Sequence, residues 1–293
     1  MAAKASQCLQ FSVPVASERT VRKKEFSLQF PPRCKEERFP VLISCSLHPR
    51  KSATYHRSVA QKLSCSPQNY EVSVLESGTC SASFKEAIIL KNKSEEIVPY
   101  LNGRCIYLVG MMGSGKTTVG KILSEVLGYS FLDSDRLIEQ SVGETAVSDI
   151  FKLHGESFFR DNETEVLQKL SSMQRVVVST GGGAVVRPIN WRHMQKGISV
   201  WLDVPLEALA RRIVAVGTGS RPLLHCEPGD AYTKTYKRLC TLWEDRSEAY
   251  NNASARVSLE DIAAKLGYKD VCNVTPTAIA TEALVQIEYF LKK

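Results

Sequence analysis

A glycine-rich segment at residues 110–117 constrains the fold of this chain more than any other feature. It reads GMMGSGKT and matches the complete P-loop pattern G-x-x-x-x-G-K-[ST]. The apolar run at residues 105–109 precedes it, and a helical pattern that begins at Lys116 follows it. This order of strand, loop and helix is the context in which such a segment binds phosphate, so the sequence predicts an α/β domain with a phosphate site.

The P-loop predicts how a nucleotide is held. Its backbone N–H groups can converge on phosphate oxygens, and the helix N-terminus adds partial positive charge. We expect Lys116 to reach the β and γ phosphates and Thr117 to ligate Mg²⁺. The predicted nucleotide-binding residues here are Gly110, Met111, Met112, Gly113, Ser114, Gly115, Lys116, Thr117 and Thr118.

The P-loop alone does not select a class of protein, because GTPases, transport ATPases and small-molecule kinases share it. A GTPase should carry an Asn-Lys-x-Asp guanine-binding motif late in its domain. The only Asn-Lys pair of this chain, Asn92-Lys93, precedes the P-loop and lacks the Asp. The sequence therefore disfavours a GTPase.

Short apolar runs alternate with amphipathic stretches from residue 104 onward. The runs expected to be strands lie at residues 105–109, 130–132, 176–178, 198–202 and 255–259. Strands that alternate with helices form a parallel sheet covered on both faces. The fold prediction is therefore α/β, a P-loop three-layer α/β/α sandwich.

Two carboxylates, Asp133 and Asp135, follow the second predicted strand. We expect them at the carboxyl edge of the sheet, where open α/β sheets bind ligands. In a phosphoryl-transfer site one carboxylate can hold Mg²⁺ while the other accepts a proton from the attacking hydroxyl. The alternative is that Asp133 or Ser134 caps the helix that follows.

Two further motifs point to a ligand. Arg160 and Glu163 lie one helical turn apart, so the acid can orient the guanidinium as a receptor for a carboxylate. A surface ion pair is the alternative. The predicted strand at residues 176–178 leads into Ser-Thr and three glycines, residues 181–183, which permit a backbone close to a ligand or form a tight turn.

These motifs, together with Ser-Arg-Pro-Leu-Leu at residues 220–224, resemble shikimate kinase in kind and in order over residues 101 to about 250. The resemblance implies a nucleoside-monophosphate-kinase type of fold with a five-stranded parallel sheet. It also implies transfer of the γ-phosphoryl group of ATP to the 3-hydroxyl of shikimate, giving shikimate 3-phosphate and ADP for chorismate and aromatic amino acid biosynthesis.

The resemblance also implies residue roles at the substrate. Asp135 corresponds to the base for the 3-hydroxyl, and Arg160 and Arg246 correspond to the two arginines that bind the shikimate carboxylate. The glycine turn is implied to contact the substrate through its backbone, at Gly181, Gly182 and Gly183.

At the nucleotide, the resemblance implies that Lys116 and Thr117 keep their P-loop roles and that Asp133 is the carboxylate linked to magnesium. Arg221 corresponds to the arginine of a lid that closes over the phosphates, and Arg212 is expected near the adenine. ATP and Mg²⁺ are the implied cofactors.

Residues 1–65 differ in composition from the rest of the chain. They carry a net charge of +8 against +7 for the whole chain, are rich in serine, and hold only four acidic residues. This composition predicts an organellar transit peptide, with an ordinary disordered tail as the alternative. Composition does not distinguish a plastid from a mitochondrion, but the resemblance to plant-type enzymes implies import into the chloroplast stroma by the plastid machinery. We expect a linker at residues 66–100, partly helical near residues 87–90, and a kinase domain at residues 101–293.

Charge and cysteine spacing exclude other classes. Because the leader carries the positive charge, the remainder is close to neutral and a nucleic-acid partner is not expected. The nine cysteines contain no C-x-x-C pair, which disfavours a zinc site or disulfide framework. No apolar run approaches about 18 residues, so no membrane contact is expected for the mature form.

Two alternative functions remain from the sequence. One is another small-molecule P-loop kinase, such as a gluconate or nucleotide kinase. The other is a non-catalytic paralogue that binds ligand without turnover. The oligomeric state and the position at which the leader is cleaved stay open.

Overall fold

The computed structural model describes residues 78–144, 146–216 and 230–293. The predicted transit peptide and Arg221 of the predicted lid lie outside the described residues. Within these three ranges, no helix combines the length and the apolar character needed to cross a membrane.

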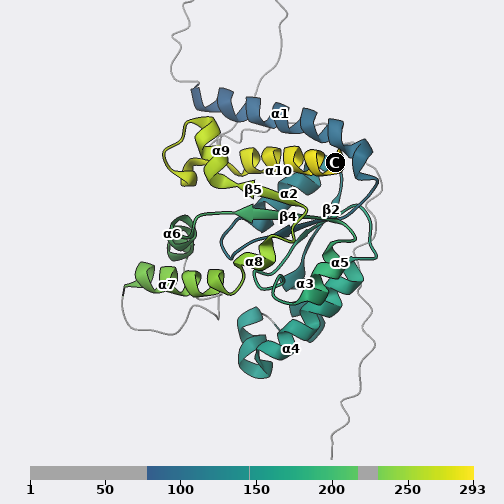
Figure 1. Cartoon of the computed structure of the whole chain (residues 1–293), viewed down its shortest axis with the longest axis vertical. Coiled ribbons are helices and arrows are strands. Elements are labelled where there is room, and N and C mark those ends of the chain that lie inside the picture. The colour runs from purple at the N-terminus through teal and green to yellow at the C-terminus, as the bar shows by residue number, and fades with distance from the viewer. Residues whose placement is uncertain (1–77, 145, 217–229) are drawn as a thin grey trace, which may run out of the picture. The chain divides into compact units, whose positions relative to one another are not determined.

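A five-stranded parallel sheet forms the centre of the domain (Figure 1). Its strands are β1 (Ile106–Val109), β2 (Ser130–Asp133), β3 (Val176–Ser179), β4 (Ile198–Asp203) and β5 (Ala255–Ser258). Their order in the sheet is β2-β3-β1-β4-β5, and every neighbouring pair is parallel. All five strands lie where the apolar runs predicted them, which confirms the predicted fold class.

The central strands are buried because both faces of the sheet are covered. Every residue of β1 and β3 is buried, as is each residue of β4 before Asp203. Such continuous burial explains why these strands read as uninterrupted apolar runs and not as alternating patterns. The edge strand β2 is less buried, and it is the one that begins with an exposed serine, Ser130.

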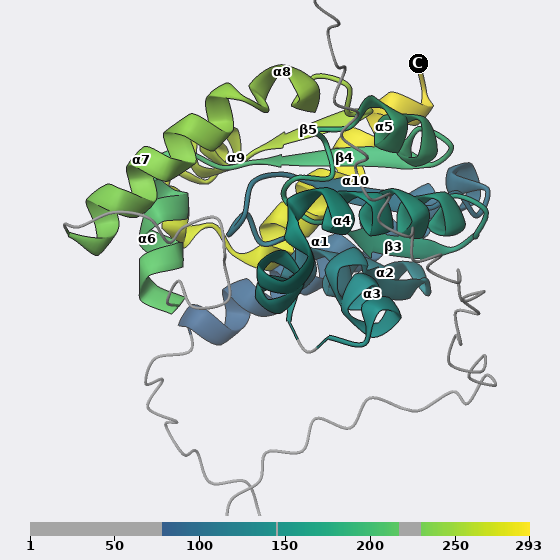
Figure 2. The same cartoon turned by 90° about the horizontal axis from the view of Figure 1, so that it is seen from below.

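Helices form the two outer layers. They are α1 (Gly78–Leu101), α2 (Lys116–Leu127), α3 (Ser134–Val142), α4 (Val147–Leu170), α5 (Pro188–Met194), α6 (Leu206–Val216), α7 (Ala231–Glu244), α8 (Ser247–Tyr250), α9 (Leu259–Leu266), the 3₁₀ helix η2 (Val271–Asn273) and α10 (Pro276–Leu291). In Figures 1 and 2, α2 and α10 cover one face of the sheet, while α3, α4 and α5 lie on the other. The three-layer prediction is confirmed.

Residues 78–100 were expected to be a linker with some helix near residues 87–90. The structure has a helix there and extends it, because residues 78–100 form most of α1. This helix packs along α10 and against α2. Its buried positions are Leu90, Ser94, Ile97 and Leu101, spaced four, three and four residues apart. That spacing is the stripe of an amphipathic helix, and exposed apolar side chains such as Phe84, Ile88 and Ile89 obscure it in the sequence.

Helix α4 is broken at Gly155, whose φ of +82° is not helical. The second part of α4 carries Glu156, Arg160 and Glu163, and packs against α5. The break therefore lets the two parts of α4 point in different directions, with the Arg160 face turned toward the end of β3.

Candidate active site

A pocket of about 770 Å³ lies at the carboxyl edge of the sheet. Its walls come from the P-loop, the end of β2, the start of α3, the second part of α4 and the turn after β3. The structure thus brings together the motifs that the sequence separated by more than a hundred residues. Those predicted site residues that line it are Met112, Gly113, Ser114, Gly115, Lys116, Thr117, Thr118, Asp133, Asp135, Arg160, Gly181, Gly182, Gly183, Arg212 and Arg246.

The P-loop connects β1 to α2, as predicted, and Gly115 precedes the first residue of the helix. The Lys116 ammonium donates to the carbonyl oxygens of Gly110 and Met111, both at 2.9 Å, and to Ser114 Oγ at 3.3 Å. Lys116 is 8% exposed. Its positive charge is thereby held beside the backbone N–H groups at the start of α2, where an anion is favoured.

Three oxygen-bearing side chains meet in the lining of the pocket. Thr117 Oγ1 lies 3.1 Å from Asp133 Oδ2 and 3.2 Å from Ser179 Oγ. A hydroxyl and a carboxylate at the P-loop suit Mg²⁺, which is held by few protein oxygens and keeps several waters. No cluster of three or more His, Cys, Asp and Glu side chains forms a metal site in the part of the chain described here. Ser179 was not among the predicted site residues.

Asp133 also caps α3, because its Oδ1 accepts from the Asp135 N–H at 3.1 Å. The capping alternative is therefore correct for Asp133, and it does not displace the functional one, because Oδ2 of the same carboxylate faces Thr117. Asp135 lies in the first turn of α3 and not on the strand, so the cap fixes where its carboxylate points.

Asp135 is half-buried, and one of its two carboxylate oxygens is left without a partner in the part of the chain that is described. Its Oδ1 is buried and has no hydrogen-bond partner among the described residues. Burial raises the pKa of Asp135 to about 7, with further contributions from the negative charges of Glu163 and Asp133 and an opposing one from Lys116. A carboxylate with a pKa near neutral is suited to accept a proton from a hydroxyl.

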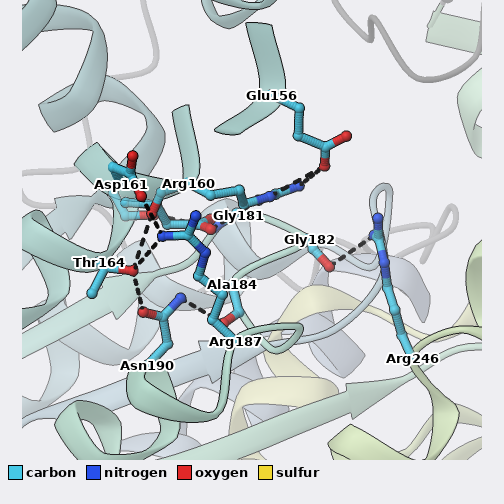
Figure 3. A network of polar contacts seen from close by, with 12 residues as sticks. Glu156, Arg160, Asp161, Thr164, Gly181, Gly182, Ala184, Arg187, Asn190 and Arg246 are labelled. Atoms are coloured by element: carbon cyan, nitrogen blue, oxygen red, sulfur yellow. Dashed lines mark hydrogen bonds and ion pairs between the residues drawn. The ribbon is translucent and has the colours of Figure 1, made fainter. Parts of the chain in front are cut away.

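Arg160 is held by two acids of the same helix, as Figure 3 shows for Glu156. Its Nη1 donates to Glu163 Oε2 at 2.8 Å, and its Nε and Nη2 contact Glu156 Oε1 at 3.3 and 3.1 Å. Burial acts to lower the pKa of Arg160, but Glu163 and Glu156 outweigh it and the pKa is raised. The ion pair is buried, with Arg160 6% and Glu163 0% exposed, so the surface alternative is wrong.

Arg246 enters the pocket from the opposite side, just before α8 (Figure 3). Its Nη1 donates to the carbonyl oxygen of Gly182 at 3.1 Å, and the Tyr250 hydroxyl contacts the same oxygen at 3.4 Å. The Tyr250 ring stacks on Trp201, with centroids 5.3 Å apart. Burial lowers the pKa of Arg246 below its ordinary value, although an arginine stays charged at neutral pH.

Neighbouring side chains of the site require glycine in the turn after β3, which the sequence did not reveal. A Cβ added to Gly181 would lie 2.6 Å from Asp135 Oδ1 and 2.9 Å from Glu163 Oε1. One added to Gly183 would lie 2.2 to 2.5 Å from the Arg160 guanidinium. These glycines thus admit the site's own charged side chains, in addition to any bound ligand.

A polar network fixes the orientation of α4 against the turn after β3 (Figure 3). Thr164 Oγ1 donates to Asn190 Oδ1 at 2.8 Å, and Asn190 Nδ2 donates to the Ala184 carbonyl oxygen at 2.9 Å. Arg187 bridges to Asp161 at 2.8 Å. The helix that presents Arg160 is therefore held to the same turn that presents the Gly182 carbonyl.

The remaining wall of the pocket comes from α6, η2 and α10. Arg212, which the resemblance implied to lie near the adenine, lines this wall together with Val216, Cys272, Val274, Pro276 and Ile279. The other five residues were not predicted, because no motif marks them and only the folded chain brings them to the pocket.

Comparisons with known proteins agree with this site. A family model described as shikimate kinase matches residues 112–288. A chloroplastic shikimate kinase of Solanum lycopersicum is 64% identical over 293 residues, which cover 100% of this chain and 97% of that protein. The chloroplastic shikimate kinase 1 of Arabidopsis thaliana is 59% identical over 258 residues, which cover 88% and 84%.

A solved structure is similar to this chain in fold as well as in sequence. The shikimate kinase of Acinetobacter baumannii in complex with shikimate is 33% identical to this chain, with a TM-score of 0.54, and the match covers 67% of this chain and 97% of that one.

These findings confirm the predicted fold and the predicted class of enzyme, a kinase that uses ATP. The plant relatives are named chloroplastic, which confirms the predicted plastid location. In its sequence, its fold and the residues of its pocket, this chain belongs to the shikimate kinase family.

Proposed function

We propose that this chain transfers the γ-phosphoryl group of ATP to the 3-hydroxyl of shikimate, with Asp135 as the base that receives the hydroxyl proton. The observation that carries the assignment is the buried, unpartnered Oδ1 of Asp135 between the P-loop and the Arg160 guanidinium. Such an oxygen lacks only a donor, and the acceptor hydroxyl supplies one.

The acceptor end of the pocket is built for a carboxylate. Arg160 and Arg246 both line it, and Arg246 is anchored on the Gly182 carbonyl, which leaves other donors of each guanidinium for a ligand. Two buried arginines recognise a carboxylate by charge and by paired hydrogen bonds. We assign the shikimate carboxylate to these two side chains and the backbone of Gly181, Gly182 and Gly183 to the substrate ring.

The nucleotide end follows from the P-loop. Its N–H groups and Lys116 bind the phosphates. Arg212 lies on the wall that we assign to the adenine of ATP. Thr117 and Asp133 would hold Mg²⁺, which neutralises charge on the transferred phosphoryl group. Arg221 stays a proposal as the arginine that closes over the phosphates.

Catalysis in this arrangement depends on alignment. A phosphoryl transfer needs little covalent participation from the protein, so the chain contributes by holding the hydroxyl opposite the γ-phosphate and by balancing charge. The residues assigned to catalysis are Asp135, Lys116 and Arg221.

The decisive experiment compares Asp135→Asn with Arg160→Ala in a coupled assay of ADP formation. Asp135→Asn should lose about 10² to 10⁴ in kcat and still bind ATP, because it removes the base and not the nucleotide site. Arg160→Ala should mainly raise KM for shikimate. Near-normal turnover of Asp135→Asn would contradict the assignment of the base.

A panel of acceptors tests the other candidate functions. Gluconate and nucleoside monophosphates should give no ADP above background, whereas shikimate should. Shikimate binding without product in the presence of ATP and Mg²⁺ would instead support the non-catalytic paralogue.

We also propose that residues 1–65 are a transit peptide handled by the plastid import machinery and absent from the mature enzyme. Import into isolated chloroplasts should shorten the chain by about this length. A chain that enters at full length would contradict the proposal.

A further inference from the structure

Part of the pocket wall is formed at the start of α10, and the hydroxyl of Thr275 caps this helix. Cys272, Val274, Pro276 and Ile279 line the pocket. Thr275 lies among them and caps α10, since its Oγ1 accepts from the Ala278 N–H at 3.1 Å. The position of this wall therefore depends on how the Thr275 side chain is held.

The same hydroxyl contacts α1. Thr275 Oγ1 donates to Glu86 Oε2 at 2.7 Å, across 189 positions of sequence, and the contact is partly buried. The single hydroxyl proton is thus directed at a carboxylate, and an oxygen lone pair is left for the Ala278 N–H. Without the carboxylate, the hydroxyl loses the partner that orients it for capping.

A second attachment joins the two helices farther from the pocket. Lys93 Nζ contacts Glu288 Oε2 at 2.5 Å, and the two side chains are 19% and 17% exposed. Glu288 lies 13 positions after Thr275, which is about 20 Å along an α-helix. Glu86 and Lys93 meet α10 in the same order along both helices, so α1 runs parallel to α10 beside it (Figure 1).

We propose that Glu86 is a positioning residue of the nucleotide end of the pocket. Through Thr275 it holds the wall formed by Cys272, Val274, Pro276 and Ile279 against the bound nucleotide. This makes α1, which lies before residues 112–288 that match the family model, part of the working enzyme and not only a support for α10. The inference rests on the proposed assignment of the P-loop end of the pocket to ATP.

Steady-state kinetics of the full chain test the proposal. Glu86→Met keeps about the length of the side chain and removes the oxygen that accepts from the Thr275 hydroxyl, and Thr275→Val removes the hydroxyl. Both should raise KM for ATP and the Kd for ADP by about threefold to tenfold, as expected for a displaced contact surface. KM for shikimate should stay at the wild-type value, and Thr275→Ser should restore both nucleotide constants.

Two matched variants separate positioning from general loss of stability. Lys93→Gln breaks the distant attachment, so it should lower Tm and leave both KM values unchanged. Glu95→Gln is the control on the same helix. Among the described residues, Glu95 pairs with exposed Lys91 at 4.0 Å, so this variant should alter neither quantity.

Two outcomes would overturn the proposal. One is a folded Glu86→Met protein with the wild-type KM for ATP. The other is an equal rise in KM for ATP in Lys93→Gln, which would make the effect a general consequence of loosening α1. If the wild-type chain itself neither binds ADP nor consumes ATP, the proposed function fails instead, so the two failures are distinguishable.

Discussion

At the scale of single residues, Asp135 shows how a reactive group is kept at a cost in stability. Its ordinary pKa of 3.8 is raised to about 7 in the folded protein, first by burial and then by Glu163 and Asp133. A carboxyl with a higher pKa in the folded than in the unfolded chain binds its proton more tightly when folded. Between pH 4 and pH 7 unfolding therefore releases a proton, and the free energy of unfolding falls as pH rises.

Asp135→Asn should consequently stabilise the protein above pH 7, because it removes a half-buried negative charge that lies close to Glu163 and Asp133. We expect a gain of about 1 to 2 kcal/mol in the free energy of unfolding at pH 8, shrinking toward zero near pH 4. Urea unfolding in nucleotide-free buffer with a chelator measures it. If the variant were equally or less stable than wild type at pH 8, the ionised Asp135 carboxylate would not destabilise the folded protein, and the argument from its raised pKa would be wrong.

The glycine turn supports a second residue-scale prediction. In Gly181→Ala the new methyl group would meet Asp135 Oδ1 and Glu163 Oε1 at less than contact distance, so both carboxylates must move. We expect kcat/KM for shikimate to fall by about 10- to 100-fold, since small displacements of a catalytic group are costly. Kinetics on the folded variant check this, and the Kd for ADP should change little.

Individual residue roles were predictable only in part. Arg160 and Glu163 were correctly paired because a helix fixes the geometry of residues three apart. The double role of Asp133, cap to α3 and neighbour of Thr117, required the folded chain, since its two oxygens serve different elements. The crowding of Gly181 by Asp135 is likewise a contact between distant segments.

At the scale of elements, the sequence predicted strands better than the first helix. Buried parallel strands such as β1 and β3 leave a plain apolar signal because every position is inside. Helix α1 buries only one stripe, and exposed Phe84 and Ile89 fill the gaps between its buried positions. A pattern count over residues 90–101 would have found the stripe, whereas average composition could not.

The packing of α1 predicts a measurable contribution to stability. Ile97 is 0% exposed on the face toward the domain, while the adjacent Val98 is 37% exposed. Ile97→Ala should lower the free energy of unfolding by about 2 to 4 kcal/mol, the usual effect of truncating a fully buried aliphatic side chain. Val98→Ala should change it by about 0.5 kcal/mol or less. Equal effects in denaturant unfolding would mean that α1 does not pack stably.

At the scale of the whole molecule, the family resemblance implied five parallel strands, but the order of these strands in the sheet was not predicted. Periodicity locates each strand, but it does not say that β1 lies between β3 and β4, because those pairings join segments far apart in sequence. The pocket depends on that order. Because β2, β3 and β1 are neighbours, their carboxyl ends lie side by side, and the P-loop follows the end of β1.

The extent of the folded unit can be tested by shortening the chain at two points. A chain that begins at Ser66 keeps α1 and should match the full chain in kcat and in both KM values, because only the proposed transit peptide is removed. A chain that begins at Asn102 loses the buried side chains of Leu90, Ile97 and Leu101 and exposes the surface of α10 that they cover. Its free energy of unfolding should fall by about 3 kcal/mol or more. Equal thermal unfolding of the two chains would place the boundary of the domain after α1, as the linker prediction had it.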